Sequence, residues 1–196
     1  MKEVIVRLGN GLGNQLFTYA AAYSFAKKNN AKLYVDNESG FYKMYKYELH
    51  NLNISAPIVE KKYKFLGIGG RIKRKILKKL NNFNQNKTFL IEERDNNKLT
   101  YFNQNQFNIN FDDKLYFEGY FQSEKYFQSE KDNLIREFAP KSEVINQSSS
   151  FIDRIKNNNS VSIHLRQESL EIYSKAAIWP RVDWAMRLIR DSSLVI

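Results

Sequence analysis

Two basic side chains at the end of an apolar segment are the first candidates for chemistry. The segment Val161–Arg166 predicts a strand, and His164 and Arg166 lie at its carboxyl end. A guanidinium combines a fixed positive charge with a fork of N–H donors, which suits a diphosphate. We therefore take His164 and Arg166 as candidate anion-binding residues. The alternative is an ordinary strand whose arginine pairs with a nearby acid such as Glu168.

A second candidate is the glycine-rich run Gly9–Gln15. Glycine reaches the backbone angles that a sharp turn from a strand into a helix requires. It also leaves the first amide groups of the helix uncovered, where they attract anions or sugar hydroxyls. A tight turn without a ligand fits the run equally well. The run lacks the Gly-Lys-Ser/Thr of a P-loop, and its glycines, at 9, 11 and 13, do not fit the dinucleotide-binding spacing G-x-G-x-x-G.

The elements that position this run form one βαβ unit. The β-branched segment Val4–Leu8 predicts a buried strand, and Leu33–Val35 predicts a second one. Between them, Leu16–Ala26 contains no glycine or proline, and its apolar residues recur at helical spacing. Asn29 and Asn30 mark the end of this helix. Ligands of open α/β sheets bind at the carboxyl ends of strands, so we expect the glycine run to border a ligand site.

A further strand-to-helix transition lies in the middle of the chain. The segment Leu115–Gly119 predicts a strand that ends at the glycine. Ser123 is a candidate N-cap, and the pattern after it predicts a helix that continues to Phe138 and stops at Pro140. We therefore expect an α/β fold with a central parallel sheet.

Positive charge is concentrated in one segment. The chain carries a formal net charge of +10, and nine basic residues without an acid lie between Lys61 and Lys79. An apolar stripe at helical spacing runs through the same segment, formed by Ile68, Ile72, Ile76, Leu77 and Leu80. A basic amphipathic helix is typical of contact with an anionic membrane surface or with nucleic acid, and a solvated helix packed on the domain is an equal alternative. Nucleic acid is not expected, because no aromatic-rich binding motif accompanies the charge.

Composition excludes several classes of site. The 196-residue chain contains no cysteine, which excludes a disulfide framework and a thiolate metal site. It has no apolar run of the roughly 18 residues that a transmembrane helix needs. The first strand begins almost at the N-terminus, which leaves no room for a signal peptide. We expect a cytoplasmic protein, with Lys61–Lys79 as a peripheral contact to the cytoplasmic membrane, and no metal, because no Asp-x-Asp follows a predicted strand.

Three strings, taken in order, resemble the α-1,2-fucosyltransferases of glycosyltransferase family 11. The first is Gly11–Phe17, GLGNQLF, followed by Tyr19 and Ala20. The second is Gly119–Phe127, GYFQSEKYF. The third begins at His164 and fits only the first half of the family's His-x-Arg-Arg-x-Asp.

The third string departs from the family pattern in its second half. Gln167 stands where the family has its second arginine, and Ser169 stands where it has its aspartate. The resemblance ends there, and the composition changes at nearly the same place. Asparagine is frequent in residues 1–159 and absent from 160–196, and both tryptophans lie in the tail.

The resemblance implies a GT-B-like protein of two Rossmann-like lobes. It implies transfer of L-fucose from GDP-fucose to the 2-hydroxyl of a galactoside acceptor, with inversion and without a metal or other cofactor. It assigns donor binding to His164 and Arg166 and assigns no general base. It places Gly11, Gly13, Asn14 and Gln15 in a loop that lines the cleft.

The extent of the match sets the expected domain organisation. We expect residues 1–166 to be the amino-terminal lobe, with a basic insertion at about 60–110 and the carboxyl lobe largely missing. Residues 167–196 are an atypical tail, for which we expect a shifted reading frame. Two alternatives stay open: an inactive fucosyltransferase remnant, and a basic domain that binds glycan or a membrane surface without catalysis.

Overall fold

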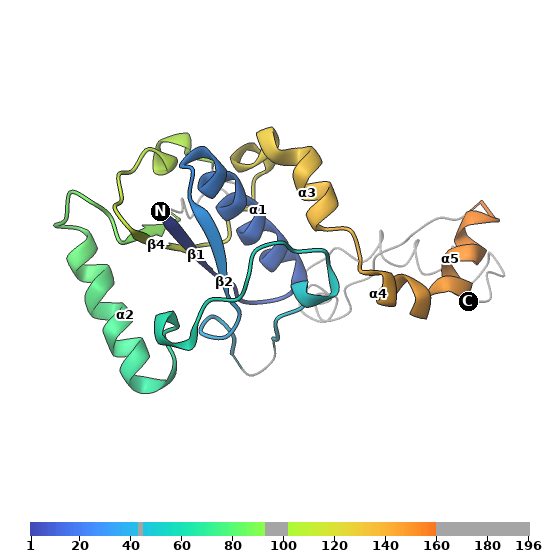
Figure 1. The fold of residues 1–196 in the computed structure, drawn as a ribbon, viewed down its shortest axis with the longest axis horizontal. Coiled ribbons are helices and arrows are strands. Elements are labelled where there is room, and N and C mark those ends of the chain that lie inside the picture. The colour runs from blue at the N-terminus through green and yellow to red at the C-terminus, as the bar shows by residue number, and fades with distance from the viewer. Residues whose placement is uncertain (43–44, 93–101, 160–196) are drawn as a thin grey trace, which may run out of the picture. The chain divides into compact units, whose positions relative to one another are not determined.

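The computed structural model describes residues 1–42, 45–92 and 102–159 (Figure 1). The chain divides into two compact units, of which residues 1–148 form the first. The second unit begins with α5 (Ser149–Lys156).

A four-stranded parallel sheet forms the centre of the first unit. Its strands are β1 (Glu3–Arg7), β2 (Lys32–Asp36), β3 (Phe89–Ile91) and β4 (Lys114–Glu118), in the spatial order β2-β1-β4-β3. All three strand pairs are parallel. The α/β, Rossmann-like fold expected from the sequence is therefore confirmed. In open α/β sheets ligands bind beyond the carboxyl ends of the strands.

The β1 strand lies between β2 and β4, and both of its faces are covered. Val4, Ile5 and Val6 are fully buried. Val6 is in register with Val35 of β2 and with Phe117 of β4. A continuous apolar run is what a doubly covered parallel strand requires.

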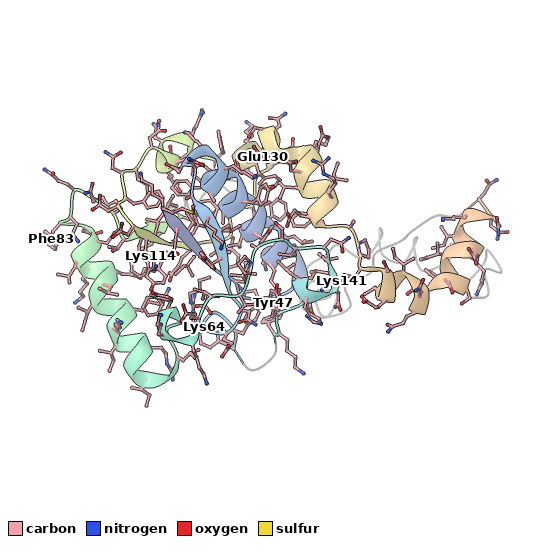
Figure 2. The ribbon with its side chains drawn as sticks, in the orientation of Figure 1. Tyr47, Lys64, Phe83, Lys114, Glu130 and Lys141 are labelled. Carbon is pink, nitrogen blue, oxygen red and sulfur yellow. The ribbon has the colours of Figure 1, made fainter. Side chains whose placement is uncertain are left out.

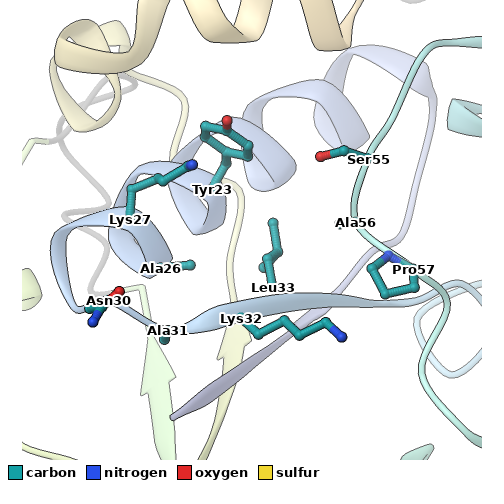
Figure 3. Close-up of a pocket in the computed structure, with 10 residues that line it drawn as sticks. All are labelled: Tyr23, Ala26, Lys27, Asn30, Ala31, Lys32, Leu33, Ser55, Ala56 and Pro57. Atoms are coloured by element: carbon teal, nitrogen blue, oxygen red, sulfur yellow. The ribbon is translucent and has the colours of Figure 1, made fainter. Parts of the chain in front are cut away.

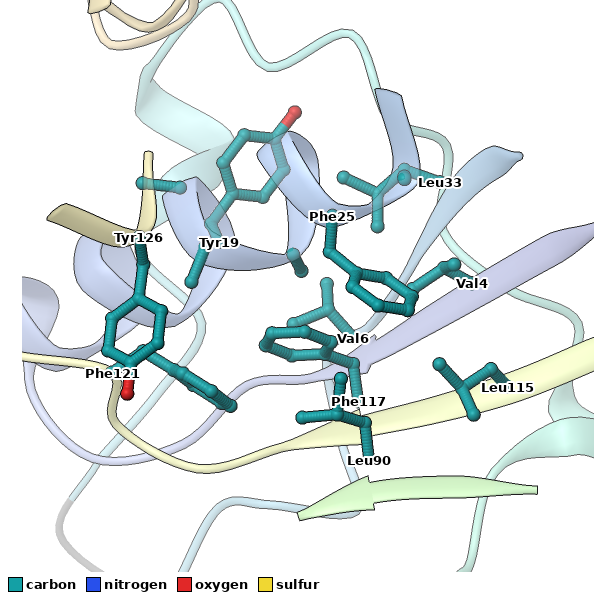
Figure 4. Packing of buried hydrophobic residues seen from close by; sticks show 14 of the residues in the cluster. Val4, Val6, Tyr19, Phe25, Leu33, Leu90, Leu115, Phe117, Phe121 and Tyr126 are labelled. Carbon is teal, nitrogen blue, oxygen red and sulfur yellow. The ribbon is translucent and has the colours of Figure 1, made fainter. Parts of the chain in front are cut away.

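Helix α1 (Leu12–Lys28) covers one face of the sheet and forms the main core with it. Phe25 packs against Phe117 and edge-on against Phe107, with ring centroids 5.7 and 5.3 Å apart. Phe121 lies 4.5 Å from Phe117 in the same cluster (Figure 4). The β1-α1-β2 connection confirms the βαβ unit predicted from the sequence.

The opposite face of the sheet carries a smaller aromatic cluster and α2 (Gly67–Asn81). Tyr116, which alternates with Phe117 along β4, stacks on Phe89 at 5.1 Å and contacts Phe65 at 4.7 Å. Phe65 immediately precedes α2, so α2 begins on the face that α1 does not cover (Figure 1). The helix predicted within the basic segment is confirmed.

The segment after β4 differs from its sequence prediction. The helix predicted from Ser123 begins only at Lys131, as α3 (Lys131–Glu137). Two 3-10 turns, η4 (Glu124–Tyr126) and η5 (Gln128–Glu130), come first, and the Ser123 side chain makes no cap bond. Tyr126 is buried, and its ring centroid lies 5.1 Å from that of Phe121. This tertiary packing overrides the local preference for a helix.

Shorter elements complete the unit. They are η1 (Leu49–Asn51), η2 (Lys61–Tyr63), η3 (Gln104–Phe107) and α4 (Ser142–Gln147). Among the described residues, no helix has the length and apolarity that crossing a bilayer demands.

Candidate functional site

A cavity of about 310 Å³ lies at the carboxyl ends of β1, β3 and β4, and we call it the edge pocket. The strands contribute their last residues, Arg7, Ile91 and Glu118. The glycine turn, the loop after β4 and the inner side of α2 supply most of the remaining walls. This is the edge of the sheet at which the sequence predicted a ligand site.

A cavity of about 430 Å³ lies beside β3 and shares Ile91 and Glu92 with the edge pocket. Another, of about 290 Å³, borders the C-terminal end of α1 and the start of β2, at the amino edge of the sheet (Figure 3). Tyr23, Lys27 and Lys32 are among its lining residues. Gly9 and Asn10 of the glycine run line the edge pocket, and no residue of that run lines either of these other cavities, so the edge pocket is the stronger candidate. The four predicted cleft residues line none of the three cavities; they are Gly11, Gly13, Asn14 and Gln15.

Close backbone approach requires glycine at Gly9, the first residue of the glycine turn, and at Gly40 opposite it. A Cβ at Gly9 would lie 2.6 Å from the Gly40 carbonyl oxygen, and a Cβ at Gly40 would lie 1.8 Å from the Leu8 carbonyl oxygen. The residue of the turn with a positive φ is Asn10, at 62°, rather than a glycine. The expectation that glycine supplies the unusual backbone angle is therefore wrong, because asparagine tolerates the left-handed region.

Gly11 and Gly13 lie at the start of α1. Gly11 is the N-cap and offers no side chain to the first amide groups. A Cβ at Gly13 would meet nothing within 4 Å. These two predicted cleft residues thus leave the N-terminal turn of α1 uncovered by side chains of their own.

Gln15, also predicted to line the cleft, is fully buried and holds two loops together. Its Nε2 donates to the carbonyl oxygens of Asn10 and Lys46, each at 2.8 Å. Its Oε1 accepts from the Glu48 backbone N–H at 3.0 Å. All of these bonds are internal to the protein, so Gln15 fixes the shape of the turn.

The first two sequence motifs meet at this edge of the sheet. The Gln122 side chain donates to Asn14 Oδ1 at 2.8 Å. The Thr18 hydroxyl lies 2.9 Å from the Gly119 carbonyl oxygen and 2.8 Å from that of Asn14. Segments more than 100 residues apart in sequence are therefore joined directly beside the edge pocket.

Glu92 shapes the loop after β4, and the sequence analysis did not identify it. Its carboxylate accepts the backbone N–H groups of Tyr120 and Phe121 at 2.7 and 2.8 Å. Phe121 is buried with a φ of 48°, a costly conformation for a bulky residue. The one signal in the sequence is the place of Glu92 directly after the apolar residues Phe89–Ile91.

Glu118, at the end of β4, binds two cations of α2. Arg74 Nε lies 2.6 Å from one carboxylate oxygen, and Arg74 Nη2 bonds the other. Lys78 Nζ lies 2.9 Å from that second oxygen. Burial alone would raise the pKa of Glu118, but hydrogen bonds and charge from Arg74 and Lys78 hold it below its usual value.

Arg7, at the end of β1, is a third cation that lines the pocket, and it is anchored by Ser39. Its guanidinium donates to the Ser39 hydroxyl at 3.2 Å and to the Ser39 carbonyl oxygen at 2.6 Å. Ser39 is in turn bonded to the buried carboxylate of Asp36, at the end of β2. A guanidinium has five N–H donors, so Arg7 and Arg74 each have more donors than these bonds use.

The charge balance of the edge pocket favours an anionic ligand. Arg7, Arg74 and Lys78 face two carboxylates, Glu92 and Glu118. In the described part of the chain, no group of His, Cys, Asp and Glu side chains is arranged to hold a metal ion. His164 and Arg166, the predicted donor-binding pair, lie outside the described residues, so their convergence with Gly13 stays a prediction.

The chain is similar to the alpha-1,2-colitosyltransferase of Escherichia coli, with 30% identity over 171 residues. The match takes in 85% of this chain and 55% of that protein, so the chain spans about half the length of the curated relative that it matches. No family model and no solved structure matches the chain. The similarity supports a glycosyltransferase family in general, and the fucose-specific expectations stay predictions.

Proposed function

We propose that this chain moves L-fucose from GDP-fucose to the 2-hydroxyl of a galactoside acceptor, with inversion and without a metal. One observation carries the proposal: the two motifs are hydrogen-bonded to each other at the carboxyl edge of the sheet, beside the edge pocket. The similarity to a colitosyltransferase supports the reaction class. Colitose is L-fucose without its 3-hydroxyl, so the choice between these two donors is part of the test.

The cations of the edge pocket suit the leaving group of such a reaction. When a nucleotide sugar reacts, negative charge builds up on the departing diphosphate, and fixed positive charge stabilises it. Arg7 of β1 and Arg74 of α2 both line the pocket, and each has N–H donors beyond those bonded to Ser39 and Glu118. Arg166 is proposed to add a further guanidinium, and His164 to lie next to it.

The acceptor hydroxyl must lose a proton to a general base. Glu118 does not suit this role, because Arg74 and Lys78 hold its pKa below the usual value. The Glu92 carboxylate is committed to the backbone of the loop after β4. We therefore assign the base to neither carboxylate of the edge pocket.

The first experiment is a calorimetric titration of the whole chain with GDP. We expect saturable binding by the wild type and binding about tenfold weaker or worse for Arg166→Ala, because charge-assisted hydrogen bonds are lost. Arg136→Ala is the matched control, since this exposed arginine of α3 bonds Asn133 and does not line the edge pocket. Circular dichroism checks that each variant folds.

Transfer is then measured with labelled GDP-fucose and GDP-colitose on a galactoside acceptor. Product from GDP-fucose, linked at the 2-hydroxyl, supports the proposal. A chain that binds GDP but uses only GDP-colitose would correct the donor. Absence of saturable GDP binding would instead favour an inactive remnant, which the incomplete third motif also suggests.

A further inference from the structure

Helix α2 presents its apolar side to the outside of the unit. Four aliphatic side chains, Ile68, Ile72, Ile76 and Leu80, are 73%, 55%, 53% and 51% exposed. Phe83, just beyond the helix end, is 88% exposed (Figure 2). An ordinary surface helix turns its apolar stripe toward the core, so α2 is oriented in the opposite sense.

The side of α2 that faces the sheet is polar. Arg74 and Lys78 bond Glu118, and Asn81 Nδ2 donates to the Phe89 carbonyl oxygen at 3.0 Å. Residues two positions apart on an α-helix point about 160° away from each other, at 3.6 residues per turn. Ile72 precedes Arg74 by two positions, and Ile76 precedes Lys78 by two. The isoleucine stripe therefore faces almost directly away from the sheet.

Positive charge flanks this stripe. Arg71, Lys75 and Lys79 follow one side of it, and Lys73 lies on the other. In the part of the chain that the structure describes, none of these four side chains has an ion pair with an acid. The sequence contains no acid between Lys61 and Lys79 to neutralise them.

We propose that α2 is an interfacial helix that docks this protein on an anionic lipid surface. The four aliphatic side chains and Phe83 enter the boundary between headgroups and acyl chains, and the flanking cations bind lipid phosphates. An outward apolar face combined with flanking Lys and Arg is the arrangement that this mode of binding requires. Lipid is favoured over nucleic acid because aliphatic side chains offer no stacking surface to bases.

The test is flotation of the whole chain with vesicles, without any nucleotide, so it is independent of the proposed transfer reaction. The vesicles are pure phosphatidylcholine or phosphatidylcholine with about a third phosphatidylglycerol. We expect binding to the anionic vesicles only, weakened by salt. The double variant Ile72→Asn/Ile76→Asn keeps every charge, and we expect its partitioning to fall about tenfold or more.

One further variant tests the contribution of positive charge, and another is a control for the apolar stripe. The triple variant Lys73→Gln/Lys75→Gln/Lys79→Gln keeps the apolar stripe and should lose its preference for anionic vesicles. Ile135→Asn is the matched control, because Ile135 is 61% exposed on α3 and lies outside the stripe. It should bind like the wild type. All of these positions are exposed, and circular dichroism verifies folding.

Two results would overturn the proposal. One is wild-type chain that fails to float with anionic vesicles. The other is binding that survives Ile72→Asn/Ile76→Asn. Light scattering on the same samples adds a third outcome: a dimer that this double variant dissociates would show that a second copy of the chain, rather than lipid, covers the stripe.

Discussion

Replacing Glu118 by glutamine tests whether charge holds α2 on the sheet. The Glu118 side chain is 6% exposed, and it binds Arg74 and Lys78. Removing one partner of a buried ion pair costs about 3–5 kcal/mol. Here the two cations are 25% and 26% exposed, so water can solvate them after the change. We therefore expect Glu118→Gln to lower the free energy of unfolding by about 1–3 kcal/mol at pH 7.

The assay is urea unfolding followed by circular dichroism across a pH series. The pKa of Glu118 is lowered in the folded state, so its ion pairs contribute stability above the unfolded value of about 4.3. That contribution is lost as the pH falls through the folded pKa. The gap between wild type and Glu118→Gln should be full at pH 7 and should close below about pH 4. Glu60→Gln, in an exposed pair with Lys62, is the matched control and should show no measurable change.

Two outcomes would refute this reasoning. A Glu118→Gln protein as stable as the wild type at pH 7 would mean that the ion pairs do not fasten α2. A gap that stays constant down to acid pH would mean that the substitution acts through packing. In either case α2 would need another attachment to the sheet, and its outward apolar stripe would need another explanation.

Three other substitutions test the loops and the core. Tyr19→Phe removes a hydroxyl that donates to Glu137 at 2.7 Å inside the protein, and we expect urea unfolding to show a loss of about 1.5–3 kcal/mol. Gly119→Ala forces a φ of 153° on alanine and places its Cβ 2.3 Å from that of Glu92, so the unfolding free energy should fall by about 1–3 kcal/mol, measured as a lower melting temperature. Glu92→Gln weakens the acceptor of the Phe121 N–H, and hydrogen exchange at that amide should accelerate about tenfold.

The first two of these substitutions have matched controls. Tyr23→Phe changes a half-buried neighbour of Tyr19 on α1, and it should be nearly neutral. Gly13→Ala adds a Cβ in open space within a helix, and it should stabilise by about 0.5 kcal/mol. If Gly119→Ala matched Gly13→Ala in its effect, the close approach to Glu92 would not constrain the loop. Equal losses in the two tyrosine variants would remove the special role of the Glu137 bond.

Local patterns in the sequence predicted the βαβ unit and helix α2. The β-branched strand before the glycine turn and the alanine-rich helix after it carry their own periodicity, so the βαβ unit was predictable. The same holds for the helical spacing of Ile68, Ile72 and Ile76 in α2. That spacing could not show which side of α2 faces outward, because the partner of its inner side, Glu118, lies 40 residues or more away.

The candidate site was predictable in position and unpredictable in its contacts. The carboxyl edge follows from the strand pattern, and the edge pocket lies there. Two contacts depend on how distant segments pack, which no local spacing encodes. They are the hydrogen bond from Gln122 to Asn14 and the bonds that Glu92 accepts from the loop after β4. At Ser123 the local pattern was misleading. It predicted a helix start there, but burial of the aromatic ring of Tyr126 produced a 3-10 turn instead.

Arg74 and Lys78 have two roles. Their donors tie α2 to Glu118, and the same side chains border the edge pocket. Any anion that enters the pocket therefore interacts with the same two cations that bind the Glu118 carboxylate. Ligand binding in the pocket and the attachment of α2 to the sheet are thus linked through Arg74 and Lys78. A bound anion should change how strongly α2 is held on the sheet.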